Sequence, residues 1–590
     1  MSEYRAPVRE MLFVINELAG LEQLNRLSGF EEVTPDLVEA ILQEAAQLAD
    51  EVIAPTNQIG DAIGTRVEDG QVRVAPEFST AYRQYVDGGW AGLTGNPKHG
   101  GQGLPFLINV AVEEMWQSAN LAWSLCPLLT QGAAHALEAH GSDQLRAAYA
   151  TRLTTGEWTG TMSLSEPQAG SDLAAIRTQA VPEGDRYRIS GQKIFITYGD
   201  HDMTENVIHL VLARTKDAPE ESGGLSLFLV PKRLPDADGN AGGLNGVKVV
   251  SVENKLGIHG SPTCVLSFEN AVGFLLGSEH NGLACMFTMM NHARLNVGLE
   301  GISIAARAYQ QALAHARERV QGSAPGHEGR VTIIHHPDVR RMLMTIKAEI
   351  EAMRAVAYVT AAELDRARHD PDPQRRAVHQ ARVDLTTPVV KGWITESGQV
   401  LTSIALQIHG GTGYIEEAGA AQHYRDARIA TIYEGTTGIQ ANDLVGRKIL
   451  RDGGEAVTIL LDEMGQFGEQ WNSGDEFATA RNAYISAVEQ LRQSVAWLLA
   501  NYEQDATIAG AVSYHLLMQM GLVAGAWQMA RAAEIAANKL AKVDQEEDFY
   551  SAKLVTVRFY IEQILPRANA HASAIRSGGA TTMALNEQQF

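Results

Sequence analysis

RYRISGQKIFIT, at residues 186–197, is the run of sequence from which the fold class can first be inferred. It is rich in β-branched and aromatic residues, a composition that predicts a strand. Four more runs of this kind follow it, separated by Gly, Pro, Asn and Asp: NVIHLVLAR, GLSLFLVP, GVKVVS and TCVLSFENAVGFLLG. The spacing favours a small antiparallel barrel or sandwich over βαβ units, and we assign residues 158–277 to this central β domain.

The sequence on both sides of this β region has helical periodicity. Within residues 36–157, the segment TPDLVEAILQEAAQLADEVIAP has apolar residues at helical spacing, with Thr34 as a candidate N-cap and Pro55 as the stop. The segment LINVAVEEMWQSANLAWSLCPLLTQGAAHALEAHG predicts one or two buried helices. Residues 278–452 predict a bundle of long helices, in which DPDPQRR is a turn-rich connection.

The two ends of the chain lie outside this helix, strand, helix pattern. Residues 453–590 contain further amphipathic helices, which we interpret as an appended helical domain that ends in a frayed tail. Residues 1–35 form an N-terminal extension. The predicted fold class is therefore α+β: an N-terminal helical domain, a central antiparallel β-barrel or sandwich, a C-terminal four-helix bundle and the appended helical domain.

Composition narrows the class of protein. The 590 residues are 45% apolar and 20% charged, as in a soluble globular protein, and the net charge of -22 argues against non-specific binding of nucleic acid. The three cysteines match no metal-binding spacing, and their odd number fits a reducing compartment. The N-terminus is no signal peptide, and no run of about 18 uncharged apolar residues predicts a spanning helix. We expect a cytoplasmic protein, and membrane binding is not indicated.

Five short segments carry the chemistry: MSLSEPQAGSD (162–172), KIFIT (193–197), NHARL (291–295), QIHGGTGYI (407–415) and YRDARIATIYEGTTGIQ (424–440). Each alone has an ordinary structural reading, such as a polar turn, a plain strand or a solvated loop acid. In this order they resemble the acyl-CoA dehydrogenase family over about residues 36–450. Beyond residue 450 the chain resembles the larger members, which have an extra C-terminal helical domain.

The resemblance implies a reaction and a base. Members of the family remove an α-proton and a β-hydride from an acyl-CoA thioester, and the hydride passes to N5 of FAD. The base is the Glu of the YEG motif, here Glu434, whose carboxylate is made more basic by apolar and aromatic neighbours such as Tyr433. The Glu434 backbone N–H and a flavin ribityl hydroxyl would polarise the thioester carbonyl, as in an oxyanion hole.

The resemblance also implies which residues contact the ligands. Those that match FAD-binding positions are Met162, Leu164, Ser165, Gly170, Ser171, Phe195, Thr197, Arg319, Gln407, Gly410, Gly411 and Thr436. Those that match positions near the acyl-CoA are Ser171, Asn291, Arg294, Tyr433 and Gly435. Several FAD contacts of the family cross a dimer interface, so a homodimer or a dimer of dimers is implied, with an electron-transfer flavoprotein as electron acceptor.

Several alternatives stay open at this point. Acyl-CoA oxidases and nitroalkane oxidases have the same fold. Within the dehydrogenases we place ordinary fatty acyl-CoA first and 3-(methylthio)propanoyl-CoA second. A DNA-associated alkylation-response flavoprotein is a candidate of another class, against which the acidic charge and the lack of a basic C-terminal stretch count. A non-catalytic FAD-binding protein is a further one. His335–His336 and His201–Asp202 have no ligand partner at useful spacing, so we expect no metal site.

Overall fold

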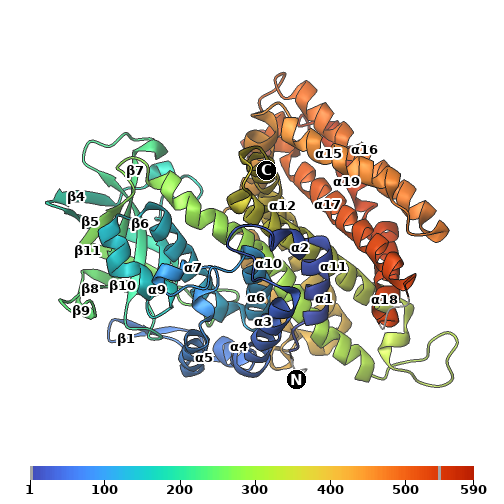
Figure 1. Ribbon diagram of the computed structural model, residues 1–590, viewed down its shortest axis with the longest axis horizontal. Helices are drawn as coiled ribbons and strands as arrows, with labels where there is room; N and C mark the ends of the chain where they lie inside the picture. The colour runs from blue at the N-terminus through green and yellow to red at the C-terminus, as the bar shows by residue number, and fades with distance from the viewer. Residues whose placement is uncertain (1–3, 543–545) are drawn as a thin grey trace. The chain divides into compact units, whose positions relative to one another are not determined.

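The computed structural model describes residues 4–542 and 546–590, which group into two compact units (Figure 1). The β-containing unit comprises Glu44–Pro105 and Met115–Asn296. The helical unit comprises Met1–Gln43, Phe106–Glu114 and Val297–Phe590. Three segments far apart in the sequence therefore fold together in the helical unit, and two in the β-containing unit.

A seven-stranded sheet organises the β-containing unit. Its strands are β3 (Thr159–Ser163), β4 (Gln179–Glu183), β5 (Arg186–Thr197), β6 (Val207–Thr215), β7 (Leu225–Pro231), β10 (Val247–Val252) and β11 (Thr263–Leu276). The hydrogen-bonded order is β10-β11-β5-β4-β6-β3, and β7 pairs with both β11 and β6, so β11, β5, β4, β6 and β7 close into a ring. The five predicted strands are confirmed as β5, β6, β7, β10 and β11. Most pairs are antiparallel, but β6 runs parallel to β3 and β4.

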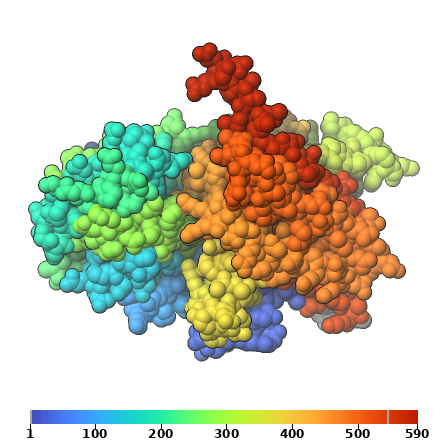
Figure 2. All heavy atoms as spheres, turned by 90° about the horizontal axis from the view of Figure 1, so that it is seen from above, coloured from blue at the N-terminus to red at the C-terminus, as the bar shows by residue number. Residues whose placement is uncertain are grey.

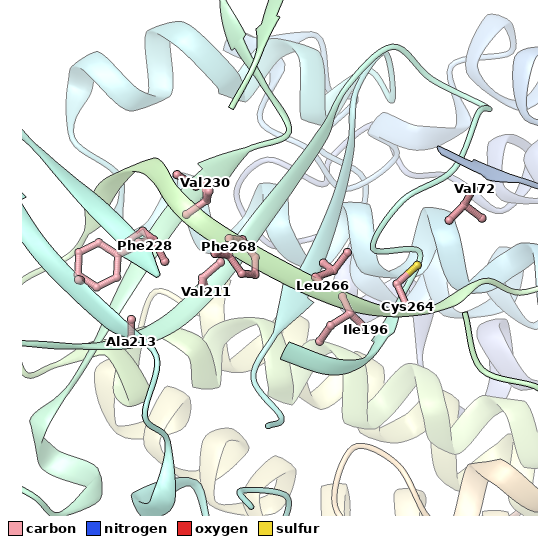
Figure 3. Packing of buried hydrophobic residues seen from close by; sticks show 12 residues of the cluster. Val72, Ile196, Val211, Ala213, Phe228, Val230, Cys264, Leu266 and Phe268 are labelled. Atoms are coloured by element: carbon pink, nitrogen blue, oxygen red, sulfur yellow. The ribbon is translucent and has the colours of Figure 1, made fainter. Parts of the chain in front are cut away.

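The interior of this ring is an apolar cluster, shown in Figure 3. Val211 of β6, Phe228 and Val230 of β7, and Leu266 and Phe268 of β11 are all fully or almost fully buried in it. Burial of one such side chain stabilises the fold by about 1.5–3 kcal/mol. The strands β6 and β7 are apolar almost without alternation, because both of their faces are covered.

The N-terminal helical region contains five α-helices of eight residues or more, and the first continues as a π-helical turn to Ile53, two residues before the predicted stop at Pro55. They are α3 (Pro35–Leu48), α4 (Thr56–Ile63), α5 (Pro76–Asp87), α6 (Phe106–Ala119) and α7 (Leu121–His140). The Leu37 amide donates to Thr34 Oγ1 over 3.3 Å, which confirms the predicted N-cap. The long apolar segment forms two helices, because Asn120 leaves the helical conformation and its side chain accepts a hydrogen bond from the Trp123 amide.

The α7 helix packs directly on the sheet. The Gly160 amide of β3 donates to Thr130 Oγ1 of α7 over 3.1 Å. A Cβ atom at Gly160 would lie 2.4 Å from the Ala133 side chain, so only glycine permits this approach. The first helices and the sheet of the β-containing unit therefore share one packed interface.

Three long helices form the centre of the helical unit: α10 (Gly282–Glu318), α11 (Pro337–His369) and α12 (Pro373–Ile408). The α10 helix starts in the β-containing unit and continues into this one. Asp372, in the predicted turn-rich connection, caps α12 by accepting from the Gln374 amide. The shorter helices α13 (Ala420–Ala427) and α14 (Thr437–Asn442) flank the segment with the YEG motif.

The appended helices belong to the same unit. They are α15 (Glu455–Gln470), α16 (Ala478–Asn501), α17 (Ile508–Leu540), α18 (Glu547–Phe559) and α19 (Arg567–Ser577). The α17 helix packs against α16, α18, α19, α11 and α12 (Figure 1). By length and hydropathy α17 could cross a membrane, yet 61% of its most apolar window is buried, as in a core helix. The final residues, dark red in Figure 2, project from the rest of the chain.

The N-terminal extension packs on the last helices of the chain. Its helix α1 (Val8–Phe13) places the Phe13 ring 5.7 Å from the Phe549 ring of α18, between ring centroids. Lys553, also on α18 and almost fully buried, donates to Glu10 and to Glu351 of α11, each over 2.5 Å. The two ends of the sequence are therefore joined by buried apolar and ionic contacts.

Candidate functional site

The predicted base lies in a strained turn of the helical unit. Glu434 is half-buried and has a φ of 55°, and the next residue, Gly435, has a φ of 86°. The left-handed conformation costs a non-glycine residue roughly 1–2 kcal/mol. Such strain persists only where the surroundings determine the backbone, and it is concentrated at functional sites. The conformation of Glu434 is thus an independent sign that this turn has a specific task.

Hydrogen bonds fix the turn on both sides. On the N-terminal side, the Tyr433 hydroxyl donates to Glu300 Oε2 over 2.5 Å. On the C-terminal side, Gln440 Nε2 donates to the Glu434 carbonyl over 3.1 Å, and the Thr437 hydroxyl donates to Glu396 Oε1 over 2.6 Å. The base is therefore presented by a segment that is tied to α10, α12 and α14.

Thr436, predicted to contact FAD, is the N-cap of α14. Its Oγ1 accepts a hydrogen bond from the Ile439 amide over 3.3 Å, and its side chain is half-buried. A hydroxyl can accept this bond and still donate one to a ligand. Together with Tyr433 and Gly435, it places three of the predicted contact residues in the same turn as Glu434.

Two charged residues beside this turn were not marked from the sequence. Glu300 of α10 and Lys391 of α12 are both fully buried. The α10 and α12 helices approach closely at this level: a Cβ atom at Gly301 would lie 2.5 Å from the Ile394 carbonyl oxygen. Burial raises the pKa of the Glu300 carboxyl to about 8, Glu434 adds to this effect, and Tyr433 and Lys391 oppose it. The sequence held a signal, since each is an ionisable residue within an apolar stretch, GLEGISIAA and PVVKGWI.

A second group of predicted residues meets at the end of α12. Gln407, Gly410 and Gly411 are exposed, and a Cβ at either glycine would meet no atom within 4 Å. His409, just before the glycines, stacks on His315 of α10 with ring centroids 4.8 Å apart. Arg319 lies one turn beyond His315, at the exposed end of α10. The helical unit therefore brings the predicted arginine and the glycine turn to one region of its surface.

The β-containing unit holds the other predicted FAD residues. Ile194 donates its amide proton to the Ser165 carbonyl over 2.9 Å, which places the KIFIT strand beside the SEPQAGSD loop. Met162, Leu164, Ser165 and Thr197 are half-buried, and Gly170 and Ser171 are exposed. These residues share one region of the β-containing unit.

Phe195 is the most informative of this set. Its side chain is 61% exposed, although large apolar side chains of this unit are mostly buried, and its φ of 58° is left-handed. A ring held outward by a strained strand suits stacking on a flat aromatic group. A Cβ at Gly170 would meet no atom within 4 Å, which leaves that backbone open to a ligand. These observations fit the isoalloxazine and phosphates of FAD.

The loop between these residues is organised by a buried ion pair that sequence reasoning did not identify. Glu166 is 4% exposed and accepts from Lys193 Nζ over 2.8 Å. It accepts further hydrogen bonds from the Gln168 side chain, the Arg177 amide, and both the amide and hydroxyl of Thr178. Although burial favours the neutral acid, Lys193 and the other donors lower the pKa of Glu166 to about 2. Lys193 also donates to the Leu164 carbonyl over 2.9 Å, so the pair fixes the predicted flavin-facing backbone.

The two residues predicted near the acyl-CoA on α10 have different surroundings. Asn291 is exposed. Arg294 is 7% exposed, and its guanidinium carbon lies 5.8 Å from the centre of the Phe287 ring. Among residues 4–542 and 546–590, no three His, Cys, Asp or Glu side chains are grouped so that they could hold a metal ion.

Four family models match the chain in sequence order. They are "Acyl-CoA dehydrogenase, N-terminal domain" over residues 36–157, "Acyl-CoA dehydrogenase, middle domain" over 161–271, "Acyl-CoA dehydrogenase, C-terminal domain" over 280–449, and "Acetyl-CoA dehydrogenase C-terminal like" over 460–586. The chain is also 45% identical to the 3-methylmercaptopropionyl-CoA dehydrogenase of Ruegeria pomeroyi, over 98% of both chains.

Two further comparisons span nearly the whole chain. The broad-specificity linear acyl-CoA dehydrogenase of Mycobacterium tuberculosis is 34% identical, with complete coverage of both chains. The crystal structure of an acyl-CoA dehydrogenase complexed with FAD from Bacillus anthracis superposes with a TM-score of 0.75, covering 95% of this chain and 91% of that one at 19% identity. At that identity the structure supports the fold, which includes the appended helices.

Proposed function

Because the chain belongs to the acyl-CoA dehydrogenase family of FAD-dependent oxidoreductases that act on CH–CH groups, we propose that Glu434 is its catalytic base. The single observation that supports this role best is the left-handed φ of 55° at Glu434 in a turn anchored on both sides. In this role the Glu434 carboxylate takes the α-proton of an acyl-CoA, and the product is the trans-2-enoyl thioester.

The residues of the chain have separate tasks in this reaction. FAD, when bound, accepts the hydride of the β-carbon. Phe195 packs on the flavin ring, and the open backbone at Gly170, Gly410 and Gly411 admits the phosphates and adenosine. The Glu434 backbone N–H donates to the thioester carbonyl, which stabilises the negative charge that develops there as the proton leaves.

The magnitudes are consistent with these tasks. A well-placed general base contributes about 10²–10⁴-fold to a rate. One donor to a developing oxyanion contributes about 10²–10³-fold. Both contributions come from the same residue, through its side chain and its backbone N–H, so the backbone conformation of Glu434 controls both. The strained turn is therefore the part of the helical unit that the chemistry depends on most.

For the substrate we propose an unbranched acyl-CoA, with 3-(methylthio)propanoyl-CoA as a specific second candidate. The 45% identical relative supports the methylthio substrate, and the 34% identical relative, named for linear acyl-CoA, supports straight chains. A thioether in place of a methylene leaves the α- and β-carbons unchanged, so one set of catalytic residues serves both. Only the end of the pocket needs to differ.

We also propose an electron-transfer flavoprotein as the acceptor and a homodimer or dimer of dimers as the assembly. Both follow from family membership. The exposed end of α10 at Arg319 and the exposed turn at Gly410 and Gly411 suit FAD contacts across such an interface. A cytoplasmic location is proposed as well, in keeping with three cysteines that are buried and unpaired by disulfides.

The test is anaerobic reduction of the purified yellow protein. Short, medium and long acyl-CoA substrates and the methylthio analogue are mixed with it, and the flavin absorbance is followed. We expect bleaching by at least one of them, and Glu434→Gln to keep FAD and lose the reduction rate by about 10³-fold or more. Glu417→Gln, at an exposed glutamate outside the turn, is the matched control and should react normally. A flavin that stays oxidised across the whole set would refute the function.

A further inference from the structure

Glu300 is a second carboxyl group associated with the base. It lies on α10, is fully buried, and accepts a hydrogen bond of 2.5 Å from the hydroxyl of Tyr433, the residue directly before Glu434. The charge of Glu434 acts on both Glu300 and Tyr433. The two carboxyl groups are therefore within electrostatic reach of each other, and Glu300 is hydrogen-bonded to the residue that precedes Glu434 in the sequence.

The surroundings of Glu300 keep its proton bound. The pKa of its carboxyl is raised to about 8, mainly by burial and in part by the charge of Glu434, against the opposing effects of the Tyr433 hydroxyl and the Lys391 ammonium. These groups come from the YEG turn and from α12. Asp426, on α13, acts on Tyr433 from a third side. At pH 7 the Glu300 carboxyl is therefore mostly neutral.

Glu300 provides a side-chain anchor on the N-terminal side of the turn, next to the backbone hydrogen bonds that the Ile432 and Tyr433 amides donate to the Ile429 carbonyl. Gln440 and Thr437 fix the segment after Glu434, through the Glu434 carbonyl and Glu396. Before Glu434, the side-chain hydrogen bond from Tyr433 to Glu300 fixes it. Since a left-handed glutamate needs support from its surroundings, loss of this bond would let the base move.

We propose that Glu300 is a positioning residue for the base, which holds Tyr433 through its carboxyl group and sets, by its own protonation state, the negative charge that Glu434 faces. This inference rests on the proposed role of Glu434. The two parts of the role are separable, because a glutamine can still accept the bond from Tyr433 but cannot ionise.

The charge effect has a definite direction. When Glu300 loses its proton above about pH 8, a new negative charge faces Glu434. That charge stabilises the protonated form of Glu434, so Glu434 becomes a stronger base and the removal of the α-proton is favoured. The rate constant for flavin reduction should therefore rise as the pH increases from 7 to 9.5.

The experiment measures anaerobic single-turnover reduction of the holoenzyme by its best acyl-CoA between pH 6 and 10. The wild type should show a several-fold rise with a midpoint near pH 8. Glu300→Gln should react within about threefold of the wild type at pH 7 and lack the rise. Glu300→Ala should be about tenfold slower or worse at every pH, with the dissociation constant of the acyl-CoA changed less than threefold. Glu349→Gln, at a buried glutamate paired with Arg567, is the control and should keep the rise.

An infrared measurement on the resting holoenzyme reads the same group without turnover. Raising the pH from 7 to 10 should remove a protonated-carboxyl C=O band from the wild type and from Glu349→Gln, whereas Glu300→Gln should lack this band at both pH values. A Glu300→Gln variant that keeps both the band and the rate increase would overturn the inference and leave the proposed function intact. A wild type that no acyl-CoA reduces would instead remove the proposed function, and the role of Glu300 with it.

Discussion

Glu166 in the β-containing unit and Glu300 in the helical unit are alike in burial but differ in charge, since Glu166 is ionised and Glu300 is mostly neutral at pH 7. Each is at most 4% exposed, and each holds a segment that carries predicted site residues. Glu166 accepts hydrogen bonds from Lys193, Gln168, Arg177 and twice from Thr178, whereas Glu300 accepts one from Tyr433. The pKa of Glu166 is lowered to about 2 and that of Glu300 is raised to about 8.

The difference shows that donors, more than depth, decide the charge of a buried carboxyl group. Burial favours the neutral acid in both places. At Glu166 the Lys193 ammonium and four further hydrogen-bond donors outweigh the effect of burial. Glu166 is therefore ionised throughout the physiological pH range and holds its loop in place. At Glu300 the resulting pKa, about 8, lies near physiological pH, and the charge of Glu300 therefore changes with pH in that range.

The largest expected effect concerns the pH dependence of stability at Glu300. Its native pKa of about 8 exceeds the ordinary value of 4.5, so the folded protein holds a proton that the unfolded chain releases between these pH values. Stability from this group therefore falls as the pH rises through that window, by up to about 5 kcal/mol. Glu300→Gln should melt several degrees above the wild type at pH 8 and show no such gain at pH 4.5. Equal melting shifts at both pH values would contradict the neutral state of Glu300.

Removal of the Glu166 side chain comes next. Glu166→Ala leaves Lys193 buried without its carboxylate and should destabilise the β-containing unit by about 3–5 kcal/mol. FAD should be lost on gel filtration, because the loop from Leu164 to Ser171 is no longer fixed. The double variant Glu166→Ala, Lys193→Met is the control and should recover part of the stability. A single variant that unfolds within 1 kcal/mol of the wild type in urea would show that the pair is dispensable.

A somewhat smaller effect is expected at acid pH, where Glu166 becomes protonated. The pKa of Glu166, about 2, lies below its ordinary value of 4.5, so its stabilisation is present above pH 4.5 and is lost as the pH falls toward 2. That loss corresponds to about 3 kcal/mol. Glu166→Gln should be less stable than the wild type at neutral pH, and the gap should close during acid titration followed by tryptophan fluorescence. A gap that stays constant down to pH 2 would mean that Glu166 is not ionised in the fold.

The smallest expected effect concerns a single hydrogen-bond donor to Glu166, the hydroxyl of Thr178. Thr178→Val removes the hydroxyl that donates to Glu166 over 2.6 Å and leaves the backbone amide of the same residue in place. The remaining donors keep Glu166 ionised, so the cost in the free energy of unfolding should be about 1 kcal/mol. FAD content and the reduction rate should be unchanged. A loss comparable to that of Glu166→Ala would show that the hydroxyl, and not Lys193, dominates the network.

The sequence predicted most of the fold because its signals are local. Strand composition identified β5, β6, β7, β10 and β11, and Thr34 marked the start of α3. The parallel pairing of β6 with β3 and β4, and the closure of the ring by β7, come from contacts between distant segments. Periodicity contains no information on such pairing.

The candidate site was predictable only in part, for a related reason. A motif marks the residues that are expected to contact a ligand, such as Glu434 and Phe195, and these stood out in the sequence. Glu300 and Lys193 act on those residues through a side chain or a backbone carbonyl, so their roles depend on which helices and strands become neighbours. In the sequence, the one local sign of such a residue is an ionisable side chain within an apolar run.

The contact between Phe13 and Phe549, together with the ion pairs of Lys553, has a consequence for biosynthesis. The α1 helix is synthesised more than 500 residues before its packing partners on α18. At about 5–20 residues per second, the apolar face of α1 stays uncovered for about half a minute to two minutes. During that time the uncovered face of α1 is a surface through which the nascent chain could aggregate.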